Sequence, residues 1–455
     1  MVDNGSLLAA AERLAVFARR RLRAPGLVIG LVGPDGWRHE LALGVGDVAS
    51  GRPLRTDALL PVASIGKTMT AVALLREAHA GRVDLDAAVH DHLPWLPLPT
   101  PFGPIRLRHL LAHTGGIVAG LDASPSPTVE ALALGETAPG WPPGQRYHYS
   151  NVAYALLGLV LERVAGCSYA QAIQRHVLDP CGMTASEAVT TARAQARAAT
   201  GHLELDDGTF VPAPWVPTAS GAGSTLCTAA DLGRFLRALL TGDPALLDPD
   251  AHEAMLTPAL EPGPEEPFGY GLGVEVDTAA GYRRVGHSGD GPGFHGHAHG
   301  CTETGVGVVV LCNGPWRPAA APGGTWVLVD HGLALLRAAA LGLAPPEDPA
   351  PADEADQDAA AGAGREPPGE LAALVGTYAA YNPWVPQVQV RADRDGDGLV
   401  LVWPWGDVRP LVALADGSFR VGEDHASPER VRFRAVVEGR PAQVVVSGWP
   451  FDRVD

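Results

Sequence analysis

The spacing of apolar residues over positions 1–343 predicts a mixture of helices and strands. Two short apolar runs, Leu27–Val32 and Trp37–Leu43, flank a Gly-Pro-Asp-Gly turn, which is typical of a β-hairpin. Apolar residues then recur at helical spacing, and strand-like runs return later. The predicted helices are Leu7–Arg23, Ser64–Ala80, Arg106–His113, Asn151–Ala165, Thr228–Thr241 and Thr325–Ala340, and the further strands are Leu272–Val276, Tyr282–Val285, His295–His299 and Gly305–Leu311. This pattern predicts an α/β domain, with an antiparallel sheet flanked by helices and a helical subdomain.

The pattern changes twice near the C-terminus. Residues 344–370 hold eight acidic residues, six prolines and one arginine, which predicts a solvated, extended linker. Residues 371–455 alternate valine-rich runs, such as Leu399–Val402, with Asp-Gly and Glu-Gly turns. We therefore predict three parts: a large α/β domain at 1–343, an acidic linker at 344–370 and a small antiparallel β-barrel at 371–455.

Composition narrows the class of protein. Of 455 residues, 46% are hydrophobic and 19% are charged, as in globular domains, and no run of 18 apolar residues predicts a membrane span. The net charge of −17 argues against nucleic acid or an anionic membrane as partner. The N-terminal segment has no cationic region ahead of an apolar core, so we expect a cytoplasmic protein.

The cysteine and histidine patterns give little sign of a metal or a cofactor. Five scattered cysteines without a C-x-x-C pair predict buried free thiols rather than a zinc site or disulfides. His295, His297 and His299 alternate along a predicted strand and share a face. Because no carboxylate or cysteine obviously completes a metal site, we expect a solvated or substrate-facing histidine stripe, and no cofactor.

Lysine usage singles out one position. The chain has 34 lysine and arginine residues, and Lys67 is the only lysine among them. Arginine supplies surface charge, but its guanidinium does not release a proton in proteins. A titratable amine is therefore indicated at position 67.

Ser64 lies three residues before this lysine, at the start of a predicted helix between apolar runs. Residues i and i+3 share a helix face, so the serine hydroxyl and the amine can meet. A serine needs a base to become a good nucleophile, and a buried lysine can serve. The alternative is an ordinary surface pair, which the apolar surroundings disfavour.

Two further motifs carry polar groups suited to acyl transfer. Tyr149-Ser-Asn151 opens a predicted helix; a tyrosine near an ammonium can act as general base and then acid, and the Asn151 amide can bind an amide-like substrate. His287-Ser288-Gly289 follows a predicted strand, where glycine permits close approach of a ligand. The backbone N–H groups of Asp290 and Ser64 can then form an oxyanion hole.

Other motif matches fail in context. Gly66-Lys67-Thr68 ends like a phosphate-binding loop, but Pro61 stands where the first glycine is required. Gly291-x-Gly293-x-x-Gly296 precedes a strand rather than the helix that a dinucleotide site needs. Neither nucleotide class is predicted.

In their order and spacing, Ser64-x-x-Lys67, Tyr149-x-Asn151 and His287-x-Gly289 resemble the serine β-lactamase and penicillin-binding-protein superfamily, on its class C-like branch. The resemblance covers about residues 5–340, and residues 371–455 resemble the lipocalin-like domain of some members. Supporting segments are LRHLLAHTGG at Leu107–Gly116, YSNVAYALLG at Tyr149–Gly158, STLCTAADL at Ser224–Leu232 and LVGTY at Leu374–Tyr378.

The resemblance implies a Ser64 acyl-enzyme, with Lys67 and Tyr149 shuttling protons as a coupled pair. Asn151, Ser288 and Gly289 would contact the substrate, and His287 would be a further catalytic residue that orients the substrate or tunes the site. Penicillin-active members usually carry lysine where this chain has His287, which favours ester or D-aminoacyl amide and peptide substrates. Transfer of the acyl group to an amine, as in peptide-cyclising thioesterases, stays open, as do a catalytically silent ligand-binding protein and the oligomeric state.

Overall fold

The computed structural model describes residues 3–21, 24–121, 125–205, 207–261, 268–278, 280–314, 325–349, 369–382, 384–404 and 406–455. Contacts between these residues divide the chain into two compact units. The first joins Met1–Leu85 to Leu157–Glu354, and the second joins Asp86–Leu156 to Ala355–Asp455. Most of the predicted linker lies outside the described residues, so the predicted boundaries at 343 and 370 stay predictions.

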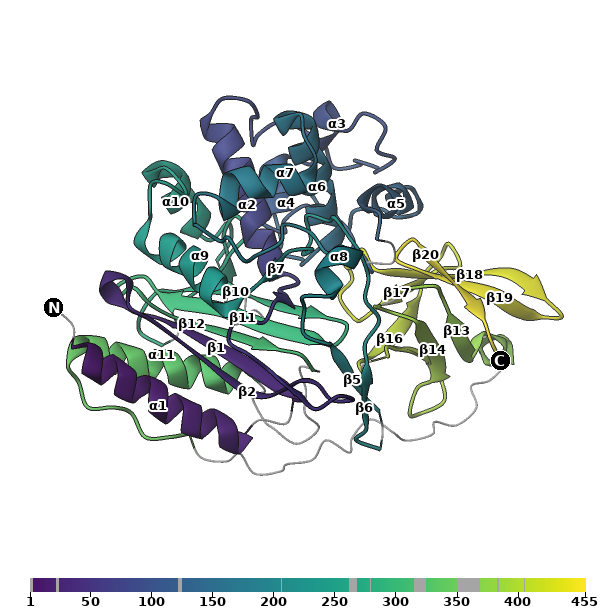
Figure 1. Ribbon diagram of the computed structural model, residues 1–455. Coiled ribbons are helices and arrows are strands. Elements are labelled where there is room, and N and C mark those ends of the chain that lie inside the picture. Colours follow the sequence, from purple (N-terminus) through teal and green to yellow (C-terminus); the bar gives the residue numbers. More distant parts are fainter. Residues whose placement is uncertain are drawn as a thin grey trace. The chain divides into compact units, whose positions relative to one another are not determined.

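An eight-stranded antiparallel sheet is the centre of the first unit (Figure 1). Its strand order is β3-β2-β1-β12-β11-β10-β9-β8, so the two ends of the unit's sequence pair directly, with Ile29 of β1 opposite Val310 of β12. The sheet strands are β1 (Gly26–Val32), β2 (Arg38–Asp47), β3 (Arg52–Pro53), β8 (Gly269–Tyr270), β9 (Glu275–Asp277), β10 (Arg284–Gly291), β11 (Phe294–Cys301) and β12 (Val306–Cys312). The short strands outside it are β4 (Leu60–Pro61), β5 (His202–Glu204), β6 (Phe210–Pro212) and β7 (Leu226–Cys227).

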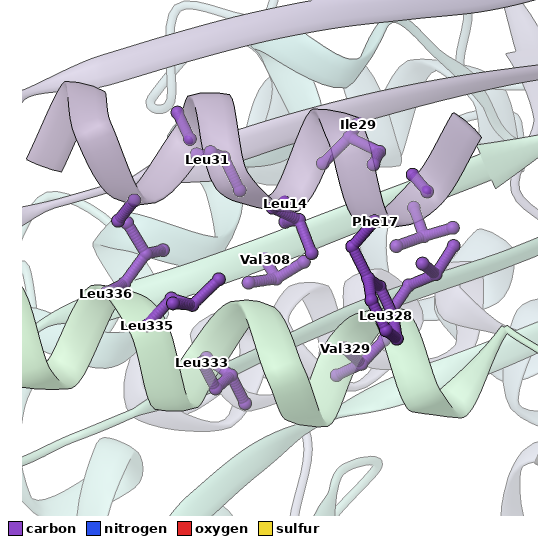
Figure 2. Packing of buried hydrophobic residues seen from close by; sticks show 14 of the residues in the cluster. Leu14, Phe17, Ile29, Leu31, Val308, Leu328, Val329, Leu333, Leu335 and Leu336 are labelled. Atoms are coloured by element: carbon purple, nitrogen blue, oxygen red, sulfur yellow. The ribbon is translucent and has the colours of Figure 1, made fainter. Parts of the chain in front are cut away.

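Two helices from opposite ends of the unit's sequence cover one face of this sheet. α1 (Asn4–Arg21) and α11 (Trp326–Leu341) lie side by side, and their apolar residues meet those of β1 and β12 (Figure 2). The alternate residues Ile29, Leu31 and Val308 point into this cluster, because strand side chains alternate between faces. Burial of this apolar area is the main stabilising contribution to the sheet.

Helices of the first unit also pack on the opposite face. α9 (Ala229–Thr241) contacts β1 and β12, and α2 (Ile65–His79) contacts β10. The Thr228 hydroxyl caps α9 by accepting the Asp231 N–H at 3.2 Å, and Gly242 ends the helix in the left-handed conformation. The other helical segments are α7 (Tyr169–Ile173), α8 (Ala192–Gln195), α10 (Pro249–Leu256), the 3-10 turn Pro34–Gly36 and the π-helical turn Gln174–Leu178.

The predicted histidine stripe is real, but the prediction that it is solvated or faces substrate is wrong. His295, His297 and His299 of β11 are at most 4% exposed. Trp326 of α11 covers His297 and His299, with ring centroids 4.5 and 4.6 Å apart. Burial lowers the pKa of His297 well below its usual value, so this ring is neutral, and the stripe is part of the core.

The second unit combines short helices with a closed antiparallel barrel of eight strands (Figure 1). Valines and aromatic residues that alternate along these strands fill the barrel interior, as the valine-rich pattern predicted. The barrel strands are β13 (Gly376–Ala379), β14 (Gln387–Ala392), β15 (Leu399–Val402), β16 (Val408–Ala413), β17 (Phe419–Val421), β18 (Arg430–Val437), β19 (Arg440–Val446) and β20 (Trp449–Arg453). The helical segments are α3 (Val89–His92), α4 (Leu107–Leu111), α5 (Pro127–Ala133), α6 (Asn151–Ala165, in which residues from Leu157 on count with the first unit), and the 3-10 turns Leu134–Glu136 and Gly369–Leu374.

The predicted α/β domain and barrel are thus confirmed, with differences at individual elements. The strand expected at Leu272–Val276 is present only as β9 (Glu275–Asp277), and β10 runs to Gly291, well past the expected end at Val285. All five cysteines are free thiols. No single helix among the described residues is long and apolar enough to cross a membrane, while the bent pair α6 with Tyr169–Leu178 passes that test by length and composition.

Candidate active site

Ser64 lies at the N-terminus of α2, and a short two-stranded sheet fixes the segment that precedes it. β4 pairs with β7, and the Val62 N–H donates to the Thr225 carbonyl at 3.0 Å. The next residue, Ala63, has a φ of +45°, which is uncommon for a residue with a Cβ atom. This tight turn brings Ser64 to the first turn of the helix, where the backbone N–H groups favour negative charge.

Lys67 lies one helical turn further along and is fully buried. Its Nζ atom is 2.8 Å from Ser64 Oγ and donates to the Ala222 carbonyl at 2.6 Å. The i,i+3 spacing therefore does bring the hydroxyl and the only amine side chain into hydrogen-bond contact. Ser64 is half-buried, whereas Lys67 is fully enclosed.

Two glycines permit other backbone segments to approach the Ser64 turn. A Cβ atom at Gly289 of β10 would lie 2.2 Å from the Val62 carbonyl oxygen and 3.1 Å from the Ser64 nitrogen. A Cβ atom at Gly223 would lie 2.4 Å from the Ala63 carbonyl, and Gly223 has a φ of +148°. Any side chain at either position would push the turn away, so glycine is required there.

His287 of β10 has protein partners at both ring nitrogens. Nε2 is 2.8 Å from the Tyr270 hydroxyl, and Nδ1 is 2.5 Å from the Ser288 carbonyl oxygen. Burial lowers the pKa of His287 to about 4, although the nearby Glu275 carboxylate opposes this shift. The ring is therefore neutral near pH 7. It donates a hydrogen bond from Nδ1 to the Ser288 carbonyl and accepts a hydrogen bond at Nε2 from the Tyr270 hydroxyl.

Glu275 of β9, which no sequence pattern indicated, lies beside β10. Its Oε1 accepts from the Ser288 N–H at 3.3 Å and from the Ser288 hydroxyl at 3.1 Å, and its Oε2 is 3.0 Å from His299 Nε2. Burial opposes its ionisation, but the His299 hydrogen bond and the neighbouring imidazoles outweigh it and lower the pKa of Glu275 to about 2. No local sequence pattern distinguishes this glutamate, because only the pairing of β9 with β10 brings it next to Ser288.

Tyr149 and Asn151 belong to the second unit, where His113 organises their loop. The His113 ring lies 4.4 Å from the Tyr149 ring, and its Nδ1 accepts the Ser150 N–H at 3.0 Å. The Ser150 hydroxyl donates to the Val118 carbonyl at 2.7 Å, and the Asn151 N–H donates to the Ala119 carbonyl at 2.6 Å. Tyr149 thus lies at the end of a loop and Asn151 at the start of α6, and hydrogen bonds tie this segment to residues 113–119.

The predicted site residues therefore fall into two groups. Ser64, Lys67 and the segment from His287 through Ser288 and Gly289 to Asp290 gather in the first unit, on α2 and β10. Tyr149 and Asn151 lie together in the second unit. The first group supplies a nucleophile, a buried amine and a nearby strand backbone, which are the elements of covalent acyl transfer. Among the described residues, no group of three or more His, Cys, Asp or Glu side chains could hold a metal ion.

Comparison with known proteins agrees with this chemistry. The beta-lactamase family model matches residues 12–333. The chain is 26% identical over 296 residues to penicillin-binding protein 4* of Bacillus subtilis (59% of this chain, 63% of the relative) and 26% identical over 312 residues to a D-aminopeptidase of Cereibacter sphaeroides (64% and 57%). It therefore spans about three fifths of the length of these relatives. It is also 27% identical over 370 residues to esterase EstB of Burkholderia gladioli (70% and 94%).

Similarity to solved structures extends over the whole chain. The octameric penicillin-binding protein homologue of Pyrococcus abyssi superimposes with a TM-score of 0.65 over 97% of this chain and 99% of that one, at 23% identity, and so shows the shared fold. SurE in its crystal structure with D-Leu superimposes with a TM-score of 0.60 over 99% of this chain and 100% of that one, at 25% identity. From the family match, the fold and the Ser64–Lys67 geometry together, this chain belongs to the beta-lactamase family, within the superfamily of β-lactamase-like serine hydrolases.

Proposed function

We propose that this enzyme hydrolyses esters or D-aminoacyl amides through an acyl-enzyme on Ser64. The observation that carries the proposal is the 2.8 Å contact between Ser64 Oγ and the buried Lys67 Nζ. A neutral amine in that position can accept the hydroxyl proton as the Ser64 oxygen attacks a carbonyl carbon. Because burial favours the neutral form of an amine in general, the fully buried position of Lys67 suits this task.

The resemblance to the superfamily supplies the remaining roles in the proposed reaction. As the bond from Ser64 Oγ to the carbonyl carbon forms, negative charge develops on the carbonyl oxygen, and the backbone N–H groups of Ser64 and Asp290 stabilise it. The coupled pair of Lys67 and Tyr149 takes the serine proton and delivers it to the leaving alcohol or amine as that bond breaks. Water then attacks the acyl-enzyme with the same proton transfers in reverse. Asn151 holds the substrate amide.

Within this scheme, His287 and Ser288 position the β10 strand. Both ring nitrogens of His287 contact protein atoms, and Glu275 holds the Ser288 backbone and hydroxyl. These contacts keep Gly289 against the Ser64 turn, where it lines the substrate groove that we propose. His287 thus acts through strand geometry and neutral charge rather than by proton transfer.

The substrate class is supported by what the relatives are called. One relative is a D-aminopeptidase and another an esterase, and SurE has been solved with D-Leu. These names, together with His287 in place of the lysine typical of penicillin-active members, favour D-aminoacyl amides and esters. We expect β-lactams to be poor substrates, so that nitrocefin is hydrolysed far more slowly than p-nitrophenyl butyrate; rapid nitrocefin hydrolysis would remove the argument from His287.

The direct test is a substrate panel run on the wild type and on Ser64→Ala. The panel contains p-nitrophenyl butyrate and the D and L enantiomers of phenylalanine amide. We expect ester turnover and a preference for the D amide, both lost in Ser64→Ala. Equal turnover by the two proteins would show that Ser64 is not the nucleophile, and no turnover or adduct with any acyl donor would favour a silent ligand-binding protein.

A second candidate reaction is transfer of the acyl group to an amine. The closed C-terminal barrel favours it, because some peptide-cyclising thioesterases that the sequence resembles carry such a C-terminal domain. Adding a primary amine to the ester assay separates the two reactions. Hydrolysis yields only the acid, whereas aminolysis yields the amide at the expense of the acid.

A further inference from the structure

One loop of the C-terminal barrel reaches the segment that carries Tyr149. Residues 422–429 connect β17 to β18 and belong to the same compact unit as residues 86–156. Asp424 pairs with Arg146 through two contacts of 2.8 and 3.2 Å, but both side chains are 47% exposed, so solvent and salt weaken this pair. The stronger contact of the loop lies at its end, at Glu429.

Glu429 is a largely buried carboxylate that holds three donors. Its side chain is 18% exposed. Oε1 accepts from the Ala119 N–H at 2.7 Å and contacts His148 Nε2 at 3.0 Å, and Oε2 accepts from the Ser447 hydroxyl. Burial opposes ionisation, but the His148 contact and the other two donors hold the pKa of Glu429 below its usual range, so the carboxylate is charged near neutral pH.

Two partners of Glu429, the His148 ring and the Ala119 N–H, belong to the two chain segments that meet at the Tyr149 loop. His148 directly precedes Tyr149. Ala119 accepts the Asn151 N–H through its carbonyl at 2.6 Å while its own N–H binds Glu429. The Glu429 carboxylate therefore joins the chain before Tyr149 to the segment whose Ala119 carbonyl accepts the Asn151 N–H.

We propose that Glu429 is a positioning residue for the reaction, so that the C-terminal barrel is needed to place Tyr149 and Asn151. This inference rests on the proposed function, because it assigns a role in that reaction to the barrel. Without the carboxylate, the Ala119 N–H and the His148 ring lose their acceptor, and the Tyr149 loop gains freedom to move. A displacement of about 1 Å in a catalytic group can cost on the order of 100-fold in rate.

The test compares Glu429→Ala with Glu429→Gln and with Glu423→Ala, which changes an exposed glutamate on the same loop. We expect Glu429→Ala to lower kcat for p-nitrophenyl butyrate by about 10- to 100-fold, with KM within about threefold, because the chemical step and not ester binding depends on loop geometry. Glu429→Gln keeps an oxygen acceptor for the Ala119 N–H and should recover much of this loss. Glu423→Ala should match the wild type.

Hydrogen exchange supplies a readout that does not depend on turnover. In Glu429→Ala, peptides covering residues 113–121 and 147–152 should exchange faster, while peptides from α2 and from the barrel strands β13–β15 should not change. Wild-type kcat in Glu429→Ala would overturn the inference, and so would faster exchange throughout the barrel, which indicates general unfolding. A wild-type protein without Ser64-dependent turnover would instead overturn the proposed function.

Discussion

The two loops that carry the proposed catalytic residues are held in different ways. The Ser64 turn is shaped by its own helix and by backbone packed directly against it at Gly223 and Gly289. The Tyr149 loop depends on side chains from distant positions, including the His113 ring and the Glu429 carboxylate. Backbone contacts that leave no space for a side chain constrain the first loop, and hydrogen bonds to distant side chains constrain the second. Substitutions should therefore damage the two loops through different mechanisms.

The largest effect is expected at Lys67. Arginine at this position cannot accept the Ser64 proton, so turnover of p-nitrophenyl butyrate by Lys67→Arg should fall by at least about 1000-fold. Lys67→Ala serves as a second variant, because the larger guanidinium must fit a fully buried site. If either variant is folded by circular dichroism and retains near wild-type kcat, the amine is not the base.

A smaller loss of activity is expected at Gly289, where the β10 backbone packs against the Ser64 turn. In Gly289→Ala, the new methyl would fall 2.2 Å from the Val62 carbonyl oxygen and displace the Ser64 turn, lowering kcat/KM by about 100-fold. Gly291→Ala, two residues along the same strand, is the matched control, since its methyl would lie 3.7 Å from the Ala63 Cβ atom in ordinary contact. Equal activities of the two variants would show that close packing at Gly289 does not shape the turn.

On the Tyr149 loop, His113→Phe keeps an aromatic ring but removes the acceptor of the Ser150 N–H. A buried donor left without an acceptor costs about 1–3 kcal/mol, so the free energy of unfolding measured in urea should fall by that amount. His113→Asn should lose less, because asparagine offers an oxygen acceptor and tolerates the φ of +55° at this position. Identical stabilities of His113→Phe and the wild type would mean that the hydrogen bond does not hold the loop.

Mild acid should affect the first sheet through His287. Its pKa is about 4 in the folded protein and near 6.5 in an unfolded chain. Between these values the unfolded state binds a proton that the folded state does not, so stability falls as pH drops from about 6.5 to 4 and is unaffected by this group above that interval. The Glu429 carboxylate, with a lowered pKa, loses its stabilising effect only below the usual glutamate range.

Hydrogen exchange can compare the two regions directly. After correction for intrinsic exchange rates, peptides of β10 should lose protection at pH 5.5 before peptides covering residues 147–152 do. The pH dependence should be shallower in His287→Gln. Earlier loss of protection on the Tyr149 loop would contradict this assignment.

The sequence predicted those parts of the molecule that depend on neighbours close in the chain. The Ser64–Lys67 contact follows from i,i+3 spacing on one helix, the α9 helix follows from its apolar spacing, and the barrel follows from its alternating valines. Glu275 and Glu429 could not be predicted, because each acts on residues that only the tertiary fold brings near. The histidine stripe was misassigned for the same reason, since α11 supplies the Trp326 that covers it.

The central claim is that Ser64 is the nucleophile activated by Lys67. The most direct measurement is the mass of the acid-quenched protein after brief exposure to p-nitrophenyl butyrate, followed by peptide mapping. The account predicts a single acyl group on the peptide that contains Ser64 in the wild type and none in Ser64→Ala or Lys67→Arg. An acyl group on another residue, or an unchanged adduct in Lys67→Arg, would contradict it.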